Sequence, residues 1–414
     1  MSMSSDIINK DLILENYENA KKIYALYDVD TDKAIEKFKT IPIGVHNWQG
    51  DDVVGFEKFE GVHSENVVTG NYPGRAHNGE QMRQDLEQAF RFSPATHKLN
   101  LHSMYAEPKE KKERNEYDTE DYRNWIDWAK KLGIGIDFNV SYFTHPMMKD
   151  GCSLASDDET VRQYWIKAGI NGRKVANDIG AELGQVCINN TWVPDGTKDM
   201  PADRAAYRRR LMDSLDRIFE KSYDKKNMRD VLEGKVFGIG TECFVVGSHD
   251  SYIAYAAKKG VGITIDTGHY HPTENIADKI TAIHPFVDSI YLHLSRGVRW
   301  DSDHCLITND DLRYILLEIK RQDLFDKNVN LGLDFFDATI NRVSSWIIGL
   351  RAAGRTLLEA LLEPSHLLKE AEEKNDLTRR LALMEEFRNL PVNAVWDYLC
   401  MKEGKGVGTS WLKE

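Results

Sequence analysis

The sequence predicts an α/β protein built as a (β/α)8 TIM barrel. Short apolar runs rich in β-branched residues alternate with longer segments of helical periodicity, a pattern typical of parallel sheets with helical crossovers. Eight such runs are present, and eight parallel strands close a barrel of this kind. Polar residues fall at or near the C-terminal end of each run, which is the face that carries the active site in this architecture.

The eight runs follow one another along most of the chain: Ile41–Trp48, Lys98–Tyr105, Gly133–Asn139, Leu183–Trp192, Lys235–Glu242, Gly262–Asp266, Ser289–His293 and Val329–Asp334. Their polar ends are His46, His102, Asn139, Trp192, Glu242, Asp266, His293 and Asp334. A doubly wound open sheet accommodates the same alternation, but it gathers its polar residues around one crevice. Polar residues at every strand end therefore favour the barrel.

Helical segments flank the predicted barrel on both sides. We expect an N-terminal helical segment over residues 1–40, the catalytic barrel over 41–345, and a C-terminal helical extension over 346–414 that makes oligomer contacts. Residues 70–78, after the first strand, are rich in turn formers. They form either a lid or a long surface loop.

Composition narrows the classes of function. Lys and Arg total 54 against 66 Asp and Glu, so the net charge is −12, which argues against a nucleic-acid or anionic-membrane partner. The five cysteines form no CxxC pair, so we expect reduced thiols. The first residues lack an apolar core of signal-peptide length, and no stretch reaches the roughly 18 apolar residues of a membrane span. We therefore expect a cytoplasmic protein.

Four of the strand-end residues form a candidate metal site. Glu242, Asp266, His293 and Asp334 end four successive predicted strands, so their side chains converge at the mouth of the barrel. Carboxylate oxygens with one imidazole suit Mn²⁺, Mg²⁺ or Co²⁺, and the lack of thiolate ligands argues against a structural zinc. Any one residue could instead cap the next helix, but four in succession favour a metal.

A second candidate set lies close by in the sequence. His269 comes three residues after Asp266, and Asp301 and Asp303 follow His293 in the next loop. Carboxylates two residues apart can point the same way in an extended loop and chelate one cation. A solvated acidic loop is the competing interpretation. Further polar residues nearby have weaker support: His271, His304, Asp337 and Asn341.

Three residues at other strand ends suit a sugar. Trp48, His102 and Trp192 combine aromatic faces, which stack on sugar C–H groups, with donors for hydroxyls. The sequence contains no GxGxxG or GxxxxGK[ST] phosphate loop, and no cysteine has an evident histidine partner. These patterns favour a metal-dependent enzyme acting on a small polar substrate.

Several long and specific blocks occur between about residue 40 and the C-terminus: Val45–Glu57, Thr69–Gly74, Trp192–Asp199, Asp266–Glu274, Arg299–His304 and Gly332–Arg342. These blocks resemble the L-rhamnose isomerase family, which is part of the xylose isomerase-like group. The resemblance implies a (β/α)8 barrel, a homotetramer, Mn²⁺ dependence and interconversion of L-rhamnose with L-rhamnulose.

The resemblance also implies two divalent ions per subunit, with Mg²⁺, Co²⁺ or Zn²⁺ able to replace Mn²⁺. Its structural metal site matches Glu242, Asp266, His293 and Asp334, and its catalytic metal site matches His269, Asp301 and Asp303. Some members of the wider group have a lysine two residues after the strand-five glutamate. Two residues after Glu242 stands Phe244, so no role for that lysine is carried over.

We therefore hypothesise that the protein is an aldose–ketose isomerase. It would transfer hydrogen between C1 and C2 of the sugar, either as a hydride or as a proton through an enediol. Its expected catalytic residues are Asp334, His269, Asp301 and Asp303, and Trp48, His102 and Trp192 would bind the sugar. A metal-dependent phosphoester hydrolase on the same barrel is the alternative, but it should carry a basic face for phosphate. A non-catalytic sugar-binding protein would be expected to lose some of these ligands.

Overall fold

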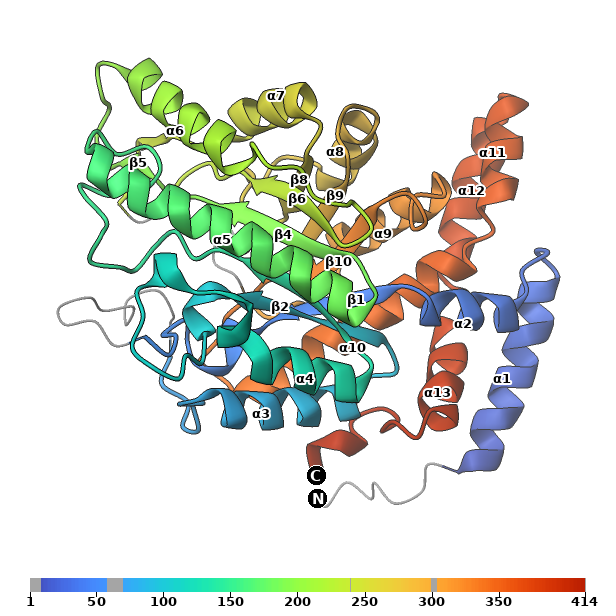
Figure 1. Cartoon of the computed structure of the whole chain (residues 1–414). Coiled ribbons are helices and arrows are strands. Elements are labelled where there is room, and N and C mark those ends of the chain that lie inside the picture. Colours follow the sequence, from blue (N-terminus) through green and yellow to red (C-terminus); the bar gives the residue numbers. More distant parts are fainter. Residues whose placement is uncertain (1–8, 58–69, 239, 299–303, 414) are drawn as a thin grey trace.

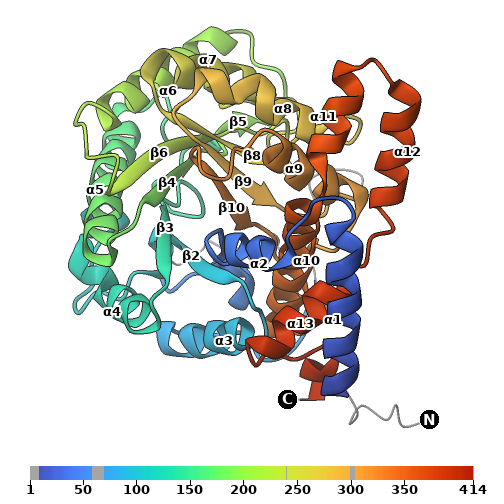
Figure 2. The same ribbon diagram turned by 90° about the vertical axis from the view of Figure 1, so that its right-hand side faces the viewer.

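The protein is a closed barrel of eight parallel strands, as predicted, surrounded by helices (Figures 1 and 2). The computed structural model describes residues 9–57, 70–238, 240–298 and 304–413. Around the barrel the strands run in the order β1, β10, β9, β8, β6, β4, β3, β2. They are β1 (Pro42–His46), β2 (Thr96–His102), β3 (Gly135–Asn139), β4 (Cys187–Trp192), β6 (Met228–Glu233), β8 (Gly262–Asp266), β9 (Ile290–Leu294) and β10 (Val329–Leu333).

The helices of the ring lie outside the strands in Figure 2. They are α3 (Gly79–Arg91), α4 (Arg123–Leu132), α5 (Glu159–Leu183), α6 (Arg204–Ile218), α7 (His249–Lys259), α8 (Ile276–Ile283), α9 (Asp310–Arg321) and α10 (Arg342–Leu362). Many begin at an Asn or Asp whose side chain accepts a backbone N–H, as Asn309 does at α9. Several helices end at a glycine in the left-handed conformation, such as Gly184 after α5, with φ of 66°.

The prediction of the fifth barrel strand was wrong. The strand is β6, Met228–Glu233, and the predicted run Lys235–Glu242 lies in the loop that follows it. Charged residues within β6 hid its strand character. In the structure Asp230 of β6 forms a buried ion pair with Arg173 of α5, with Nε 3.0 Å from Oδ1. A charge on the outer face of a strand is thus neutralised by the covering helix, which sequence periodicity does not reveal.

Just beyond this loop, β7 (Phe244–Val245) pairs with β5 (Gly196–Thr197) in a small antiparallel sheet. It ties the loop after β6 to the loop after β4.

Tyr291 of β9 lies inside the barrel and packs with Ile188 and Val231. Glycines on β10 and β1 make room for its ring. A Cβ added to Gly332 would lie 2.7 Å from the Tyr291 hydroxyl, and one added to Gly44 would lie 3.3 Å from it. The phenol ring of Tyr291 therefore fills part of the barrel interior beside the aliphatic side chains of Ile188 and Val231.

The terminal helices pack together beside the barrel. These are α1 (Lys10–Ala25), α2 (Thr31–Lys39), α11 (Ser365–Glu373), α12 (Leu377–Phe387) and α13 (Val392–Lys402). Tyr17 of α1 and Tyr398 of α13 stack with ring centroids 3.7 Å apart. The predicted boundary between residues 345 and 346 falls inside α10, which contacts β1, α3 and α9 and is the last helix of the ring. The division into domains stays a prediction.

Residues 70–78 lie against the mouth of the barrel. The backbone N–H of Tyr72 donates to Ala338, after β10, and that of Ala76 donates to Gly50, after β1. Both bonds are 2.9 Å long.

All five cysteines are free thiols, as expected. Among the described residues, no helix has both the length and the apolarity needed to cross a membrane.

Gly332→Ala should destabilise the fold by about 1–3 kcal/mol, because the new methyl group overlaps the Tyr291 ring. The midpoint of urea unfolding measures the loss. The double variant Gly332→Ala, Tyr291→Phe should recover part of it, because the hydroxyl is the atom nearest to the new methyl group. Unchanged stability of Gly332→Ala would contradict this account of the barrel interior.

Candidate metal centre

Four buried side chains converge at the C-terminal end of the barrel. They are Glu233, Asp266, His293 and Asp334, and each offers a ligand atom within 4.8 Å of the others. They come from β6, β8, β9 and the residue after β10, four strands that are neighbours in the barrel. His293 Nδ1 lies 3.1 Å from Asp334 Oδ2 and 3.4 Å from Glu233 Oε1. Three carboxylates and one imidazole are a ligand set for a hard divalent cation.

The glutamate of this group is Glu233, and the prediction of Glu242 was wrong. Glu242 is exposed in the loop after β6, where it accepts the backbone N–H of Gly240. The error follows from the misplaced strand, because the ligand is set by the strand end. The apolar pair Val231 and Leu232 just before Glu233 was the available signal.

With Glu233 at the end of the fifth barrel strand, the residue two positions further on is also a different one. Two residues after Glu233 stands Lys235, whose Nζ lies 5.1 Å from the centre of the Trp192 ring. The lysine that some members of the xylose isomerase-like group carry is thus matched here. Phe244 belongs to β7 and has no bearing on it.

The shifted pKa values of the four groups indicate that the site lacks a compensating positive charge. Burial raises the pKa of Asp266 to about 7 and also raises that of Asp334. Burial alone would lower the pKa of His293, but the negative charges of Glu233 and Asp334 raise it well above its usual value. Burial likewise opposes ionisation of Glu233, yet the charges of His293 and His269 lower its pKa to about 2.

Asp266 Oδ2 is buried without a hydrogen bond from any described residue. Buried polar atoms in native proteins are almost always bonded, so an unbonded carboxylate oxygen beside two further carboxylates indicates a ligand. It is an atom that a cation would bind. The residues present therefore fit a divalent metal ion.

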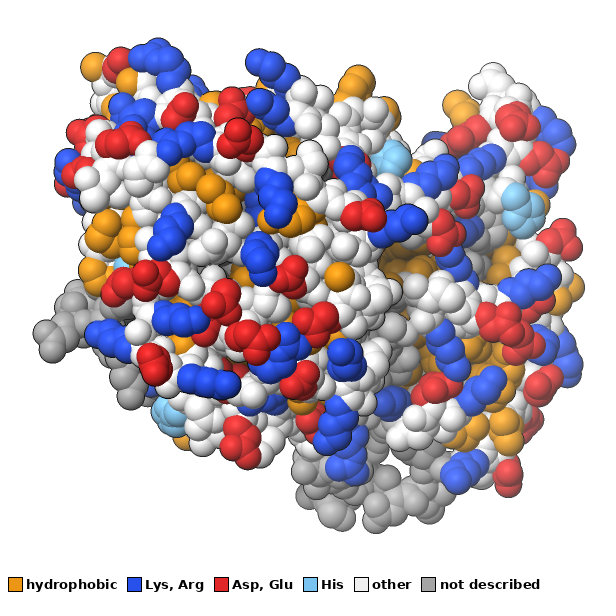
Figure 3. All heavy atoms as spheres, in the orientation of Figure 1, with side chains coloured by type: hydrophobic (Ala, Val, Ile, Leu, Met, Phe, Trp, Pro, Cys, Tyr) orange, Lys and Arg blue, Asp and Glu red, His pale blue; other side chains and the backbone are white. Residues whose placement is uncertain are grey.

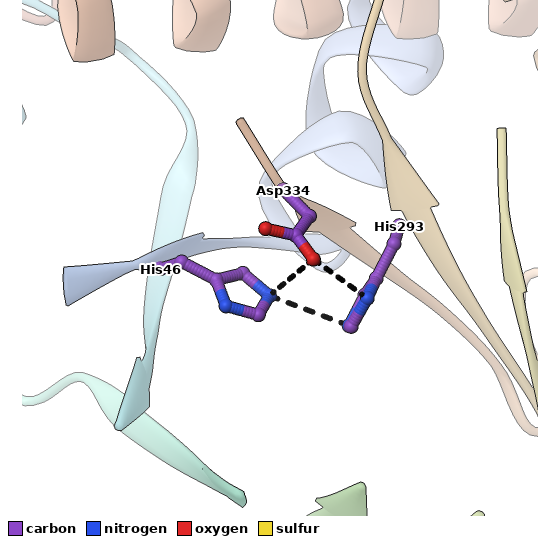
Figure 4. A group of neighbouring side chains, drawn as sticks. All are labelled: His46, His293 and Asp334. Carbon is purple, nitrogen blue, oxygen red and sulfur yellow. Dashed lines mark hydrogen bonds and ion pairs between the residues drawn. The ribbon is translucent and has the colours of Figure 1, made fainter. Parts of the chain in front are cut away.

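His46 of β1 also approaches this group (Figure 4). Its Nε2 lies 3.7 Å from Asp334 Oδ2 and 3.4 Å from His293 Nε2. The set His46, His293 and Asp334 could itself hold an ion. We assign the ion to the set that contains Glu233 and Asp266, because it supplies three carboxylates and the unbonded Asp266 Oδ2. His46 then contacts His293 at Nε2, the ring nitrogen that does not face the carboxylates.

The second predicted metal set is only partly described. His269 is buried, and its Nδ1 lies 3.1 Å from the carbonyl oxygen of Gly234. A proton on Nδ1 can bond this carbonyl and leave Nε2 available to a metal. Asp301 and Asp303 lie outside the described residues, so this site stays a prediction.

The three predicted sugar-binding residues come together beside the metal centre. Trp48 stacks on His102 with ring centres 4.0 Å apart, and the Trp48 and Trp192 rings meet edge to face at 6.5 Å. Phe143 and Phe336, which the sequence interpretation missed, extend this aromatic wall at 5.1 Å from Trp192 and 5.7 Å from Trp48. Trp48 also donates its Nε1–H to Asp334 Oδ1 at 3.1 Å, so the wall and the metal group share a contact.

The residues with weaker support do not join the group of four. Asn341 caps α10. Asp337 accepts hydrogen bonds from Thr339, whereas Asp334 directly follows β10. His271 contacts Thr273 in an exposed turn, and the backbone of His304 pairs with that of Arg296.

The chain is similar to proteins of one family over nearly its whole length. A family model described as L-rhamnose isomerase (RhaA) matches residues 12–414. An L-rhamnose isomerase of Listeria monocytogenes serotype 4a is 47% identical over 403 residues, which cover 97% of this chain and 96% of that protein. One of Rhodopirellula baltica is 48% identical over 398 residues, covering 96% and 93%. Among solved structures, an L-ribulose 3-epimerase matches with a TM-score of 0.50 and 12% identity over 82% of this chain and 98% of that one, a likeness of fold.

Glu233→Gln should weaken Mn²⁺ binding at least about a hundredfold, because it removes one buried ligand charge. Glu242→Gln is the matched control and should leave binding unchanged, because Glu242 is exposed and far along the loop. Isothermal titration calorimetry on the metal-stripped proteins measures both. Equal affinities for the two variants would contradict the assignment of Glu233.

Metal binding should strengthen as the pH rises from 6 to 8. The cation needs an ionised Asp266 and a neutral His293, and in the metal-free protein both pKa values are raised, that of Asp266 to about 7. Protons therefore compete below pH 7, and the Kd for Mn²⁺ at pH 6 should exceed that at pH 8 by at least about tenfold. Titrations in buffers of different ionisation enthalpy count the protons released, and a count of zero would contradict the prediction.

Proposed function

The chain belongs to the L-rhamnose isomerase family, and on that premise we propose that it is a metal-dependent isomerase interconverting L-rhamnose and L-rhamnulose. The observation that carries the proposal is the buried group Glu233, Asp266, His293 and Asp334 beside an aromatic wall. A cation-binding group and a stacking surface within one barrel mouth suit a small polyhydroxylated substrate.

We propose two divalent ions per subunit, with Mn²⁺ as the metal and Mg²⁺, Co²⁺ or Zn²⁺ able to replace it. The first would be held by Glu233, Asp266, His293 and Asp334, and the second by His269, Asp301 and Asp303. The ions would supply positive charge that stabilises negative charge on the sugar oxygens during the reaction.

The remaining chemistry falls to residues around the aromatic wall. Trp48 and Phe143 would stack on the C–H face of the open-chain sugar and exclude water from C1 and C2. Trp192 has a buried Nε1–H that no described residue accepts, and it would donate to a sugar hydroxyl. Lys235, at the edge of the same wall, would hold an oxygen that becomes negative.

The isomerisation leaves the atom count unchanged. One hydrogen moves from C2 to C1, and one proton moves from the C2 hydroxyl to the C1 carbonyl oxygen. The carbon-bound hydrogen travels either directly as a hydride or as a proton through an enediol. In both routes the residues must hold C1 and C2 in the extended chain and keep solvent away.

We further propose a homotetramer in the cytoplasm. Exposed apolar side chains on and beside the terminal helices support contacts with other copies of the chain: Leu26, just after α1, is 80% exposed, and Leu381 of α12 is 63% exposed. Where such side chains form a contiguous patch, they are typical of a subunit interface.

A phosphoester hydrolase on the same barrel is less well supported. Such an enzyme needs a basic surface that attracts phosphate. The face in Figure 3 carries acidic and basic side chains interspersed, without a broad basic patch. The net charge of −12 points the same way.

The purified protein should interconvert L-rhamnose and L-rhamnulose, lose activity in EDTA and regain it on addition of Mn²⁺. His269→Asn should lower kcat at least about a hundredfold while the urea midpoint stays close to that of the parent, because it removes one proposed ligand of the second ion. Glu242→Gln, in the exposed loop, should keep full activity. Full turnover after complete chelation would refute the proposal.

A further inference from the structure

A chain of hydrogen bonds crosses the inside of the barrel and ends at His102. The Tyr291 hydroxyl lies 3.2 Å from Asp137 Oδ2 and 3.1 Å from Asn100 Nδ2. Asn100 Nδ2 is also 3.1 Å from His46 Nε2, and His46 Nδ1 is 2.9 Å from His102 Nε2. The chain therefore joins the barrel interior to a residue of the aromatic wall.

The His46 ring lies between Asn100 Nδ2 and His102 Nε2, so its hydrogen bonds decide which of its nitrogens donates and which accepts. A neutral imidazole has one N–H donor and one nitrogen acceptor. The direction of the bonds along the chain therefore decides which nitrogen of His102 carries the proton.

The first constraint on this direction comes from Asp137. Its carboxylate is paired with Lys98 and can only accept, so Tyr291 donates to it. The Tyr291 oxygen then accepts from the Asn100 amide nitrogen. The same orientation lets the Asn100 oxygen accept from Asn139. Asn100 consequently donates to His46 Nε2, which must be an acceptor.

The second constraint comes from the metal group and is independent of the first. His293 Nδ1 faces Asp334 and Glu233 and is the atom that a cation would bind. A neutral ligating histidine then carries its proton on Nε2. This nitrogen lies 3.4 Å from His46 Nε2, which must again be an acceptor. Both constraints place the proton of His46 on Nδ1.

We propose that His46 fixes the tautomer of His102, holding its proton on Nδ1 so that His102 donates a hydrogen bond to a sugar oxygen. His46 Nδ1–H donates to His102 Nε2, which leaves Nδ1 as the only place for the His102 proton. Nδ1 is buried, and no described residue bonds it. Asp137, Tyr291 and Asn100 are positioning residues that act through His46. The identity of the acceptor rests on the proposed function, whereas the tautomer does not.

Two isosteric substitutions should reverse the direction of the chain. Asn100→Asp presents a carboxylate to His46 Nε2, so that nitrogen must become the donor, and the proton of His102 must move to Nε2. Asn139→Asp should act one step earlier, by turning the Asn100 amide so that its oxygen faces His46. Tyr252→Phe is the control, because it removes a buried hydroxyl that no described residue bonds.

Solid-state NMR of protein labelled with ¹³C,¹⁵N-histidine and loaded with diamagnetic Mg²⁺ tests the tautomer directly. The signals of His102 among the 13 histidines are identified by their absence in His102→Gln. The parent and Tyr252→Phe should show His102 protonated on Nδ1, and Asn100→Asp and Asn139→Asp should show it protonated on Nε2. A parent His102 protonated on Nε2, or on both nitrogens, overturns the proposal. Retention of the Nδ1 proton in both reversing variants overturns the role of the chain.

Kinetics with L-rhamnose test the donated bond. Asn100→Asp should raise KM about five- to hundredfold, because a lone pair then faces the sugar oxygen, while kcat changes much less. Tyr252→Phe should keep the parent KM. An unchanged KM beside a reversed tautomer overturns the donation to substrate. If the parent shows the Nδ1 proton but does not turn over L-rhamnose, the tautomer relay stands and the proposed function fails.

Discussion

Three carboxylates buried around one imidazole are the constraint on which the rest of the structure depends. Buried negative charges are costly unless a cation or hydrogen bonds compensate them, and here the raised pKa of Asp266 and the orphaned Asp266 Oδ2 show incomplete compensation. Strand register brings the groups together, since Asp266 pairs with His293 across β8 and β9. The closed barrel then brings β6 and β10 to the same mouth.

The barrel interior serves this site rather than only filling space. Lys98, Asp137 and Asn100 line it together with Tyr291, and the glycines at 44 and 332 admit the phenol ring. A satisfied buried polar network holds its members in one arrangement, because each broken bond leaves an unpaired group in a low dielectric. Such rigidity suits a site whose ligand and donor atoms must be aligned before a sugar arrives.

Sequence patterns predicted most of the barrel because its strands are apolar runs ending in a polar residue. That rule selected Asp266, His293 and Asp334, which the structure brings together in one buried group. Glu233 was missed because β6 carries charges that ion pairs with distant residues neutralise, and local periodicity contains no trace of those partners. The linking position of His46 depends on contacts with residues 56 and 247 positions away, which a single sequence does not reveal. Trp48, His102 and Trp192 could be grouped because each closes or follows a strand.

The most direct test of the metal centre is the anomalous diffraction of Mn²⁺ in crystals soaked with L-rhamnose. The account predicts an anomalous peak bounded by side-chain atoms of Glu233, Asp266, His293 and Asp334, with the sugar between that peak and the Trp48 ring. A peak coordinated by His46 without Glu233, or no peak within this group, would contradict it.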